Sequence, residues 1–206
     1  MLNQKMIALP DIILASGSPR RAEILSSAGW KYTKEVPDVD ESPVAGETPE
    51  VYVVRLAREK AGAIASRHSA SPVLGADTVV VIGGEMIGKP TDLDHAREML
   101  KMLSGNWHDV LTGVAICVNG TVVSGLRRTR VKFAWMNDAE IEFLALQGDP
   151  LDKAGAYAVQ AQAALFIEAI EGDYWNVVGL PINLVYELLR SVVPTVGNRS
   201  GTAGGE

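Results

Sequence analysis

Two adjacent arginines follow a short loop of small residues near the beginning of the chain. The loop ends in Ser18-Pro19, which suits a helix start, with Ser18 as the N-cap and Pro19 at the first helical position. Arg20 and Arg21 would then oppose the helix dipole, whereas free backbone N–H groups at a helix start bind anions. The pattern predicts either an anion site or two solvated surface arginines, with even weight. A Walker loop is excluded, because no Gly-Lys-Ser/Thr follows at the required spacing.

A second chemical signal is an aspartate inside an apolar run. Asp77 lies within residues 72–82, a β-branched stretch that predicts a buried strand. A buried carboxylate needs a hydrogen-bond partner, a cation or a metal. A functional carboxylate is therefore favoured over a structural aspartate that bonds to the backbone. Gly75 and Ala76 just before it predict room for a ligand.

Three carboxylates gather in the loop 38–43, from Asp38, Asp40 and Glu41. The simpler interpretation is a solvated acidic turn. The alternative is a site for a hard cation such as Mg²⁺, which prefers carboxylate oxygens.

Two lysines are harder to interpret from their neighbours. Lys60 lies on a helix predicted over 50–66 and by itself resembles a surface lysine. Lys89 follows the return strand of a predicted hairpin, which brings it to the same end of the sheet as Asp77. Farther on, small residues dominate 152–160, and they permit close contact with a backbone.

Composition narrows the class of protein. The chain has 206 residues, of which 47% are hydrophobic and 21% charged, as in ordinary soluble globular proteins. A net charge of −6 argues against a broad nucleic-acid-binding surface. The single cysteine, Cys117, excludes an internal disulfide and a cysteine-rich zinc site, and it is interpreted as a core thiol. No apolar run is long enough to cross a bilayer and none resembles a signal peptide, so we expect a cytoplasmic protein.

The elements that position these residues follow from hydrophobic periodicity and turn residues. Strands are predicted over 12–15, 31–36, 72–82, a short return ending at Ile87, 108–118, 121–135 and 164–170. Helices are predicted from Pro19 onward and over 50–66, 91–103, 138–146 and 181–191. Turns are predicted at Gly83-Gly84, Asn119-Gly120 and Gly172-Asp173, and a loop at 176–181. This alternation predicts the α/β class: a mixed twisted sheet flanked by helices, with two lobes and a central cleft.

Seven short motifs together resemble the Maf family of nucleotide pyrophosphatases. Each is weak alone, but their order along the chain is highly specific. They are Ala15-Ser16-Gly17-Ser18-Pro19-Arg20-Arg21, Leu56-Ala57-Arg58-Glu59-Lys60-Ala61, Gly75-Ala76-Asp77-Thr78-Val79, Gly88-Lys89-Pro90, Leu103-Ser104-Gly105, Asp152-Lys153-Ala154-Gly155-Ala156-Tyr157 and Asn176-Val177-Val178-Gly179-Leu180-Pro181. The resemblance places a Maf-like domain at 11–192, and the Gly- and Ser-rich residues 193–206 are expected to form a disordered tail.

The resemblance implies hydrolysis of nucleoside triphosphates to the monophosphate and pyrophosphate, with a divalent metal, Mg²⁺ or Mn²⁺. It also implies an inosine triphosphate pyrophosphatase-like fold and, often, a homodimer. One group of the family acts on dTTP, UTP and related pyrimidine nucleotides, and this chain is similar to it at Arg20, Thr78 and Gln160. We expect a role in cleaning the nucleotide pool, with a link to arrest of cell division.

The resemblance and the residue chemistry together assign roles. Asp77 is expected to hold the metal, activate the water, or both, with Glu41 as the second metal carboxylate. Arg20 is directed to the base, and Thr78 and Gln160 read a pyrimidine edge. Asp152 and Lys153 are expected to support the site. The triphosphate is held by Ser16, Arg21, Lys60 and Lys89.

Two alternatives stay open. The first keeps the fold and changes the substrate to 7-methyl-GTP or a damaged purine nucleotide. The second is a nucleotide-binding regulator of septum formation with little catalysis.

Overall fold

Strands and helices alternate along residues 9–68 and 70–193, the part of the chain that the computed structural model describes. The strands are β1 (Ile12–Ala15), β2 (Tyr32–Glu35), β3 (Val73–Ile82), β4 (Glu85–Ile87), β5 (Trp107–Val118), β6 (Thr121–Phe133) and β7 (Ile167–Glu171). The α-helices are α1 (Pro19–Ser27), α2 (Pro49–Ala65), α3 (Leu93–Leu103), α4 (Asp138–Gln147), α5 (Tyr174–Val178) and α6 (Ile182–Val192). Three 3-10 turns follow α4: η1 (Pro150–Asp152), η2 (Ala154–Ala156) and η3 (Gln162–Leu165).

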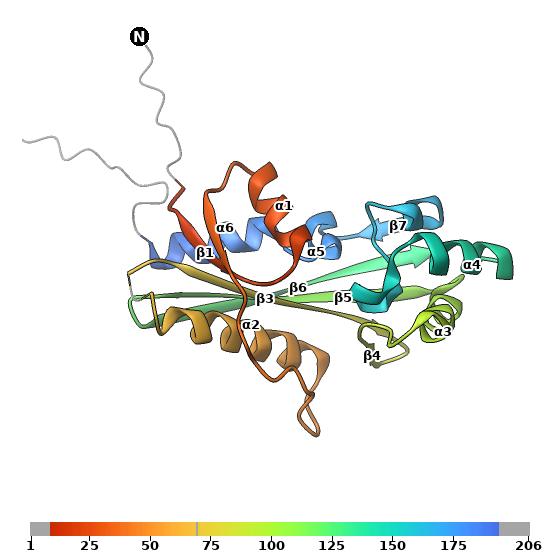
Figure 1. Ribbon diagram of the computed structural model, residues 1–206, viewed down its shortest axis with the longest axis horizontal. Helices are drawn as coiled ribbons and strands as arrows, with labels where there is room; N and C mark the ends of the chain where they lie inside the picture. The colour runs from red at the N-terminus through yellow and green to blue at the C-terminus, as the bar shows by residue number, and fades with distance from the viewer. Residues whose placement is uncertain (1–8, 69, 194–206) are drawn as a thin grey trace, which may run out of the picture.

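All of these strands belong to one mixed sheet of seven, in the order β2-β1-β3-β5-β6-β7, with β4 paired to the end of β3. β1 is parallel to both β2 and β3, and the other pairs are antiparallel. Figure 1 shows the sheet along the length of the molecule, with α2 on one face and α1 and α6 on the other. The predicted mixed α/β sheet is confirmed.

The longest strands form the hairpin that the sequence predicted. β5 and β6 pair from Val118 opposite Thr121 to Trp107 opposite Lys132. Asn119 and Gly120 adopt φ values of 50° and 75°, which suits a tight turn with two left-handed positions. Because β3 also pairs with β5 along most of its length, these three strands form a rigid support that runs through both lobes.

Helix α2 lies unusually close to the sheet. A Cβ atom on Gly75 would stand 2.2 Å from the carbonyl oxygen of Ala57, and one on Gly113 would stand 2.2 Å from that of Val53. The prediction that Gly75 makes room for a ligand is therefore wrong, because the backbone of α2 occupies that space. Cys117 is buried in the small core under this helix, as predicted.

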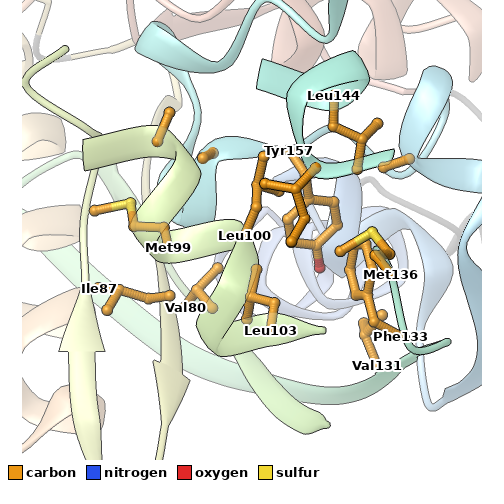
Figure 2. Close-up of a cluster of buried hydrophobic side chains, with 14 of the residues drawn as sticks. Val80, Ile87, Met99, Leu100, Leu103, Val131, Phe133, Met136, Leu144 and Tyr157 are labelled. Carbon is orange, nitrogen blue, oxygen red and sulfur yellow. The ribbon is translucent and has the colours of Figure 1, made fainter. Parts of the chain in front are cut away.

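The far end of the sheet has a separate core. Leu100 and Leu103 of α3 pack with Phe133 and Tyr157 around the end of the long strands (Figure 2). The opposite end is closed by α1 and α6, which bury Leu25 and Leu189 in a second cluster. The end closed by α1 and α6 is the first lobe of the molecule, and the end closed by α3 and α4 is the second lobe.

Two predicted segments differ in type from the structure, and the strand predicted to end at Trp135 ends at Phe133. The sequence predicts strand for residues 164–166, but residues 164 and 165 end η3 and Phe166 is a turn residue, so β7 begins only at Ile167. The predicted loop 176–181 contains the end of α5, because the side chain of Asp173 accepts hydrogen bonds from the backbone of Trp175 and Asn176 and starts a helix. Gly179, at φ 122°, then ends it. The tail predicted at 193–206 lies, except for Val193, outside the described residues.

Candidate active site

A cleft of about 590 Å³ opens between the two lobes, a size that suits a small-molecule ligand. Its walls come from the loops after β1 and β2, from α1, α2, β3 and β5, from the segment after β4, and from the region between η1 and α5. All of the site residues predicted from the sequence line it, although they are spread over the chain from 16 to 160. They are Ser16, Arg20, Arg21, Glu41, Lys60, Asp77, Thr78, Lys89 and Gln160.

Lys60 lies between two carboxylates at the floor of the cleft. Its side-chain nitrogen donates to Asp77 Oδ1 at 2.7 Å and is 2.6 Å from Glu41 Oε1. Lys60 is only 6% exposed. It is therefore not the surface lysine that its sequence neighbours suggest. The close packing of α2 on β3 brings Lys60 to Asp77, and the loop between β2 and α2 adds Glu41.

The pKa values of the two carboxylates are shifted in opposite directions. Burial raises the pKa of Asp77 above its usual value, and the positive charges of Lys60 and Arg21 offset only part of that rise. Desolvation alone would also raise the pKa of Glu41, but the hydrogen bond and charge of Lys60 hold it below its usual range. Asp77 is therefore the better proton acceptor of the pair, and Glu41 stays ionised.

Arg21 is buried and held on three sides. Its Nε donates to the carbonyl oxygen of Gly179 at 2.9 Å, and its terminal nitrogens donate to Ser16 Oγ at 3.1 Å and Thr78 Oγ1 at 3.2 Å. Thr78 Oγ1 also lies 2.9 Å from Thr112 Oγ1. These contacts fix the guanidinium in one orientation at the cleft wall. Thr78 therefore helps to orient Arg21.

Arg20 reaches across the cleft to the other lobe. Its guanidinium forms an ion pair with Asp152 Oδ2 at 2.8 Å and donates to the Asp152 carbonyl oxygen at 3.2 Å. Lys153, which is buried, donates to Asp152 Oδ1 at 2.6 Å. Asp152 thus supports Arg20, consistent with the supporting role expected for the Asp152-Lys153 pair, and Arg20 and Arg21 have different surroundings although they are adjacent.

The start of α1 faces the same cavity. Ser18 is the N-cap and Pro19 is the first helical residue, as predicted, and both line the cleft together with Gly17. The Ser18 side chain makes no capping bond, and instead Ser16 Oγ accepts from the backbone N–H of Ser18 at 3.2 Å. The helix start therefore presents partial positive charge to the cavity.

Lys89 and Gln160 lie at the exposed rim. Both line the cleft from the second lobe, Lys89 after β4 and Gln160 after η2. No ion pair within the described residues involves Lys89, so its ammonium group can be offered to a ligand. Gln160 can offer an amide donor and acceptor.

Tyr52 is a cleft residue that the sequence analysis missed. Its hydroxyl donates to the Glu41 carbonyl oxygen at 2.9 Å. Burial and the negative charges of Asp77 and Glu41 raise its pKa to about 12, so it remains a neutral donor at physiological pH. The available signal was its spacing, because Tyr52, Leu56 and Lys60 recur every four residues along one face of α2.

The two carboxylates of the cleft, Asp77 and Glu41, suit a metal such as Mg²⁺ that needs few protein ligands. Within residues 9–68 and 70–193 no group of three or more His, Cys, Asp or Glu side chains could hold an ion. Mg²⁺, however, is commonly bound by one or two carboxylates together with phosphate oxygens and waters. Asp77 and Glu41 each give one oxygen to Lys60, and the second oxygen of each carboxylate would fit that donor set when a phosphate ligand supplies the remainder.

Comparisons with known proteins show what the chain is similar to. A family profile described as "Maf-like protein" matches residues 11–192. The chain is 49% identical to a dTTP/UTP pyrophosphatase of Geotalea uraniireducens, over 90% of this chain and 96% of that one. It is 47% identical to one of Myxococcus xanthus, over 87% and 91% respectively. The Ham1 protein of Staphylococcus aureus shares the fold, with a TM-score of 0.50, 14% identity, and coverage of 88% of this chain and 98% of its own. No helix among the described residues is long and apolar enough to cross a membrane.

Proposed function

This chain belongs to the Maf family, and we propose that it hydrolyses nucleoside triphosphates, dTTP, UTP and modified pyrimidine nucleotides, to the monophosphate and pyrophosphate. The observation that carries the proposal is the ion-paired group in which the buried residues Lys60 and Asp77 meet the half-exposed Glu41, at the floor of a cleft lined by further cations. A nucleotide-binding protein without catalysis would not need a desolvated carboxylate beside the phosphates.

Water attacks the α-phosphorus in this reaction. A bond forms between the water oxygen and that phosphorus, the bond to the oxygen bridging the α- and β-phosphorus breaks, and pyrophosphate leaves with the electron pair. Asp77 accepts the proton of the attacking water, a role that its raised pKa favours. Lys60, 2.7 Å away, keeps enough of Asp77 ionised to act as a base.

Fixed cations position the triphosphate. Phosphoryl transfer needs positioning and charge neutralisation more than covalent help. Arg21 is oriented by its three hydrogen bonds, Lys89 approaches from the opposite lobe, and the start of α1 adds partial positive charge. Because the groups come from both lobes, a bound triphosphate bridges the cleft.

The proposal includes one divalent cation, Mg²⁺ or Mn²⁺, held by Asp77 and Glu41. When bound, it would neutralise charge on the phosphate oxygens and lower the pKa of a coordinated water. Support comes from the donor set, because two carboxylates leave the remaining positions to phosphate and water.

Base selection is assigned to Arg20, Thr78 and Gln160. Gln160 and Arg20 present amide and guanidinium groups to the base edge, with Arg20 aimed by Asp152. Thr78 contributes through Arg21 as well as through its own hydroxyl. A site that hydrogen-bonds its substrate discriminates against analogues that leave its polar groups unpaired.

The test is pyrophosphate release from dTTP, UTP, GTP and 7-methyl-GTP with Mg²⁺ or Mn²⁺, by the wild type and by a Thr78, Gln160 double variant. We expect dTTP and UTP to have the highest kcat/KM, and the double variant to lose that preference. Diphosphate and orthophosphate as first products would contradict the reaction. A preference for 7-methyl-GTP, or tight binding without turnover, would favour one of the two alternatives.

The biological setting is also part of the proposal. We assign the enzyme to the cytoplasm, in a nucleotide-cleaning role linked to arrest of cell division, because its substrates and its low cysteine content suit that compartment. A homodimer is expected from the family, and Phe143 and Leu146 of α4 and Leu165 of η3 are exposed apolar side chains that could be covered. Light scattering of the purified protein measures the oligomeric state.

A further inference from the structure

Glu41 is the one proposed metal carboxylate that no strand or helix holds. It lies in the segment between β2 and α2, where residues 36–48 have no regular structure other than one turn, and its side chain is 52% exposed. An irregular exposed segment does not fix a carboxylate by itself, because its backbone retains conformational freedom. Contacts from elsewhere must place Glu41 within 2.6 Å of Lys60.

Helix α2 supplies those contacts to the backbone immediately after the Glu41 side chain. The Tyr52 hydroxyl donates to the Glu41 carbonyl oxygen at 2.9 Å. Arg55, three residues farther along the helix, donates through Nη2 to the Ser42 carbonyl oxygen at 3.2 Å. Two consecutive carbonyl groups of the loop are therefore fixed to the helix that carries Lys60.

The same guanidinium group holds the later part of the loop. Arg55 Nε and Nη2 donate to the two carboxylate oxygens of Glu47 at 2.7 and 2.8 Å, and Glu47 Oε2 accepts from the backbone N–H of Val44 at 3.2 Å. On its other side Arg55 donates to Glu59 at 3.2 Å and lies over the Tyr52 ring, 5.5 Å from its centroid. Glu59 and the Tyr52 ring therefore fix the position of the Arg55 guanidinium.

We infer that Tyr52 and Arg55 are positioning residues that hold Glu41 at the metal and phosphate site. The inference rests on the proposed role of Glu41. Arg55 acts only through the loop, because it does not line the cleft. Its planar fork reaches Glu47, Ser42 and Glu59 simultaneously, which the single ammonium group of a lysine cannot reproduce.

The central variants are Arg55→Lys, which keeps the charge, and Tyr52→Phe, which keeps the ring. We expect each to lower kcat by about 10- to 100-fold, the loss expected when a group at the reacting centre is misplaced. We expect KM for the nucleotide to change little and half-maximal activity to need more Mn²⁺. The matched control is Arg58→Lys, an exposed arginine of the same helix outside the cleft lining, which should retain wild-type kinetics.

A second measurement does not depend on turnover. Hydrogen exchange of peptides covering 38–47, recorded without nucleotide or metal, should be faster in Arg55→Lys than in the wild type. Exchange in β3 and β5, which carry no part of this loop, should remain unchanged. Equal exchange of the loop in both proteins would overturn the inference.

A double variant separates positioning from a general structural role. If Arg55 acts through Glu41, the pair Glu41→Gln with Arg55→Lys should be no slower than Glu41→Gln alone. Multiplicative losses would overturn the inference, and so would a fully active Arg55→Lys beside an inactive Glu41→Gln. A fully active Glu41→Gln would instead overturn the proposed role of Glu41 itself, so the two failures can be told apart.

Discussion

The chemistry of the cleft depends on one ammonium group shared by two carboxylates of unequal burial. The side chain of Asp77 is 11% exposed on a central strand, whereas that of Glu41 is 52% exposed on a loop. Although the two carboxylates lie at similar distances from Lys60, their pKa values shift in opposite directions, because desolvation affects the buried carboxylate more. The arrangement separates a proton acceptor, Asp77, from a group that stays charged, Glu41.

Replacing Asp77 tests the proton acceptor. Asp77→Asn keeps the size of the side chain and an acceptor for Lys60 but removes the base, so we expect kcat/KM to fall by at least about 10²–10⁴-fold. Thermal unfolding should show that the variant still folds. Asp109→Asn on the neighbouring strand β5, outside the cleft, is the control and should remain active. Near wild-type rates for Asp77→Asn would remove Asp77 from the mechanism.

Replacing Lys60 and replacing Lys89 should both lower activity, but the two variants should differ in their free energy of unfolding. Lys89→Ala changes an exposed residue and should leave the free energy of unfolding unchanged, whereas Lys60→Ala leaves Asp77 buried without its nearest cation. The pKa of Asp77 then rises further above its unfolded value, so the folded state binds more protons. Lys60→Ala should therefore lose stability as pH increases above the unfolded pKa of an aspartate. Urea unfolding at several pH values measures this, and a pH-independent difference from the wild type would contradict it.

At the scale of elements, the close approach of α2 to the sheet determines where the side chains of the site lie. Gly75 and Gly113 let the helix backbone lie against β3 and β5, and this places Lys60 beside Asp77. The same helix carries Tyr52 and Arg55, which hold the loop of Glu41. One helix thus sets the distance between both proposed metal carboxylates and the ammonium group between them.

Gly75→Ala should separate these groups. The added Cβ would lie 2.2 Å from Ala57 O and 2.7 Å from Ala61 N, both of them backbone atoms, so α2 must move away from the sheet. We expect a loss of stability and of turnover together, with Lys60 displaced from Asp77. Gly62→Ala, on the exposed face of α2 with nothing within 4 Å, should instead stabilise by about 0.5–1 kcal/mol. Denaturant unfolding and kcat of both variants test this prediction. An active Gly75→Ala variant of normal stability would show that the close packing of α2 on the sheet is not required to place Lys60.

Much of this site was visible in the sequence, but its internal contacts were not. Helical periodicity and the Asn119-Gly120 turn predicted most elements, because those signals are local. The roles of Tyr52 and Arg55 depend on a loop folding back over α2, and no local pattern encodes such a return. Gly75 was assigned to a ligand because a sequence does not reveal which neighbour fills the space beside a glycine.

At the scale of the whole molecule, two lobes with separate cores share the long strands β3, β5 and β6. Arg20 and Asp152 join the lobes across the cleft through an ion pair. Substrate binding between lobes therefore depends on the integrity of both cores. The core of the second lobe contains an unusual polar contact, between His108 Nε2 and the Tyr157 hydroxyl at 2.7 Å (the Tyr157 hydroxyl is visible in Figure 2).

The burial of His108 should make the stability of the protein sensitive to acid. Burial lowers the pKa of His108 to about 4, and its Nδ1 has no hydrogen-bond partner among the described residues. An unfolded histidine has a pKa near 6.5, so the unfolded state binds the extra proton between these values. The contribution of His108 is therefore fully present above pH 6.5, and it is lost as the pH falls towards 4, by roughly 3 kcal/mol in total. His108→Gln, which cannot titrate, should show a flatter dependence of the unfolding free energy on pH between 7 and 4, whereas His95→Gln on α3 should follow the wild type. Parallel curves for the wild type and His108→Gln would show that this buried histidine does not govern acid stability.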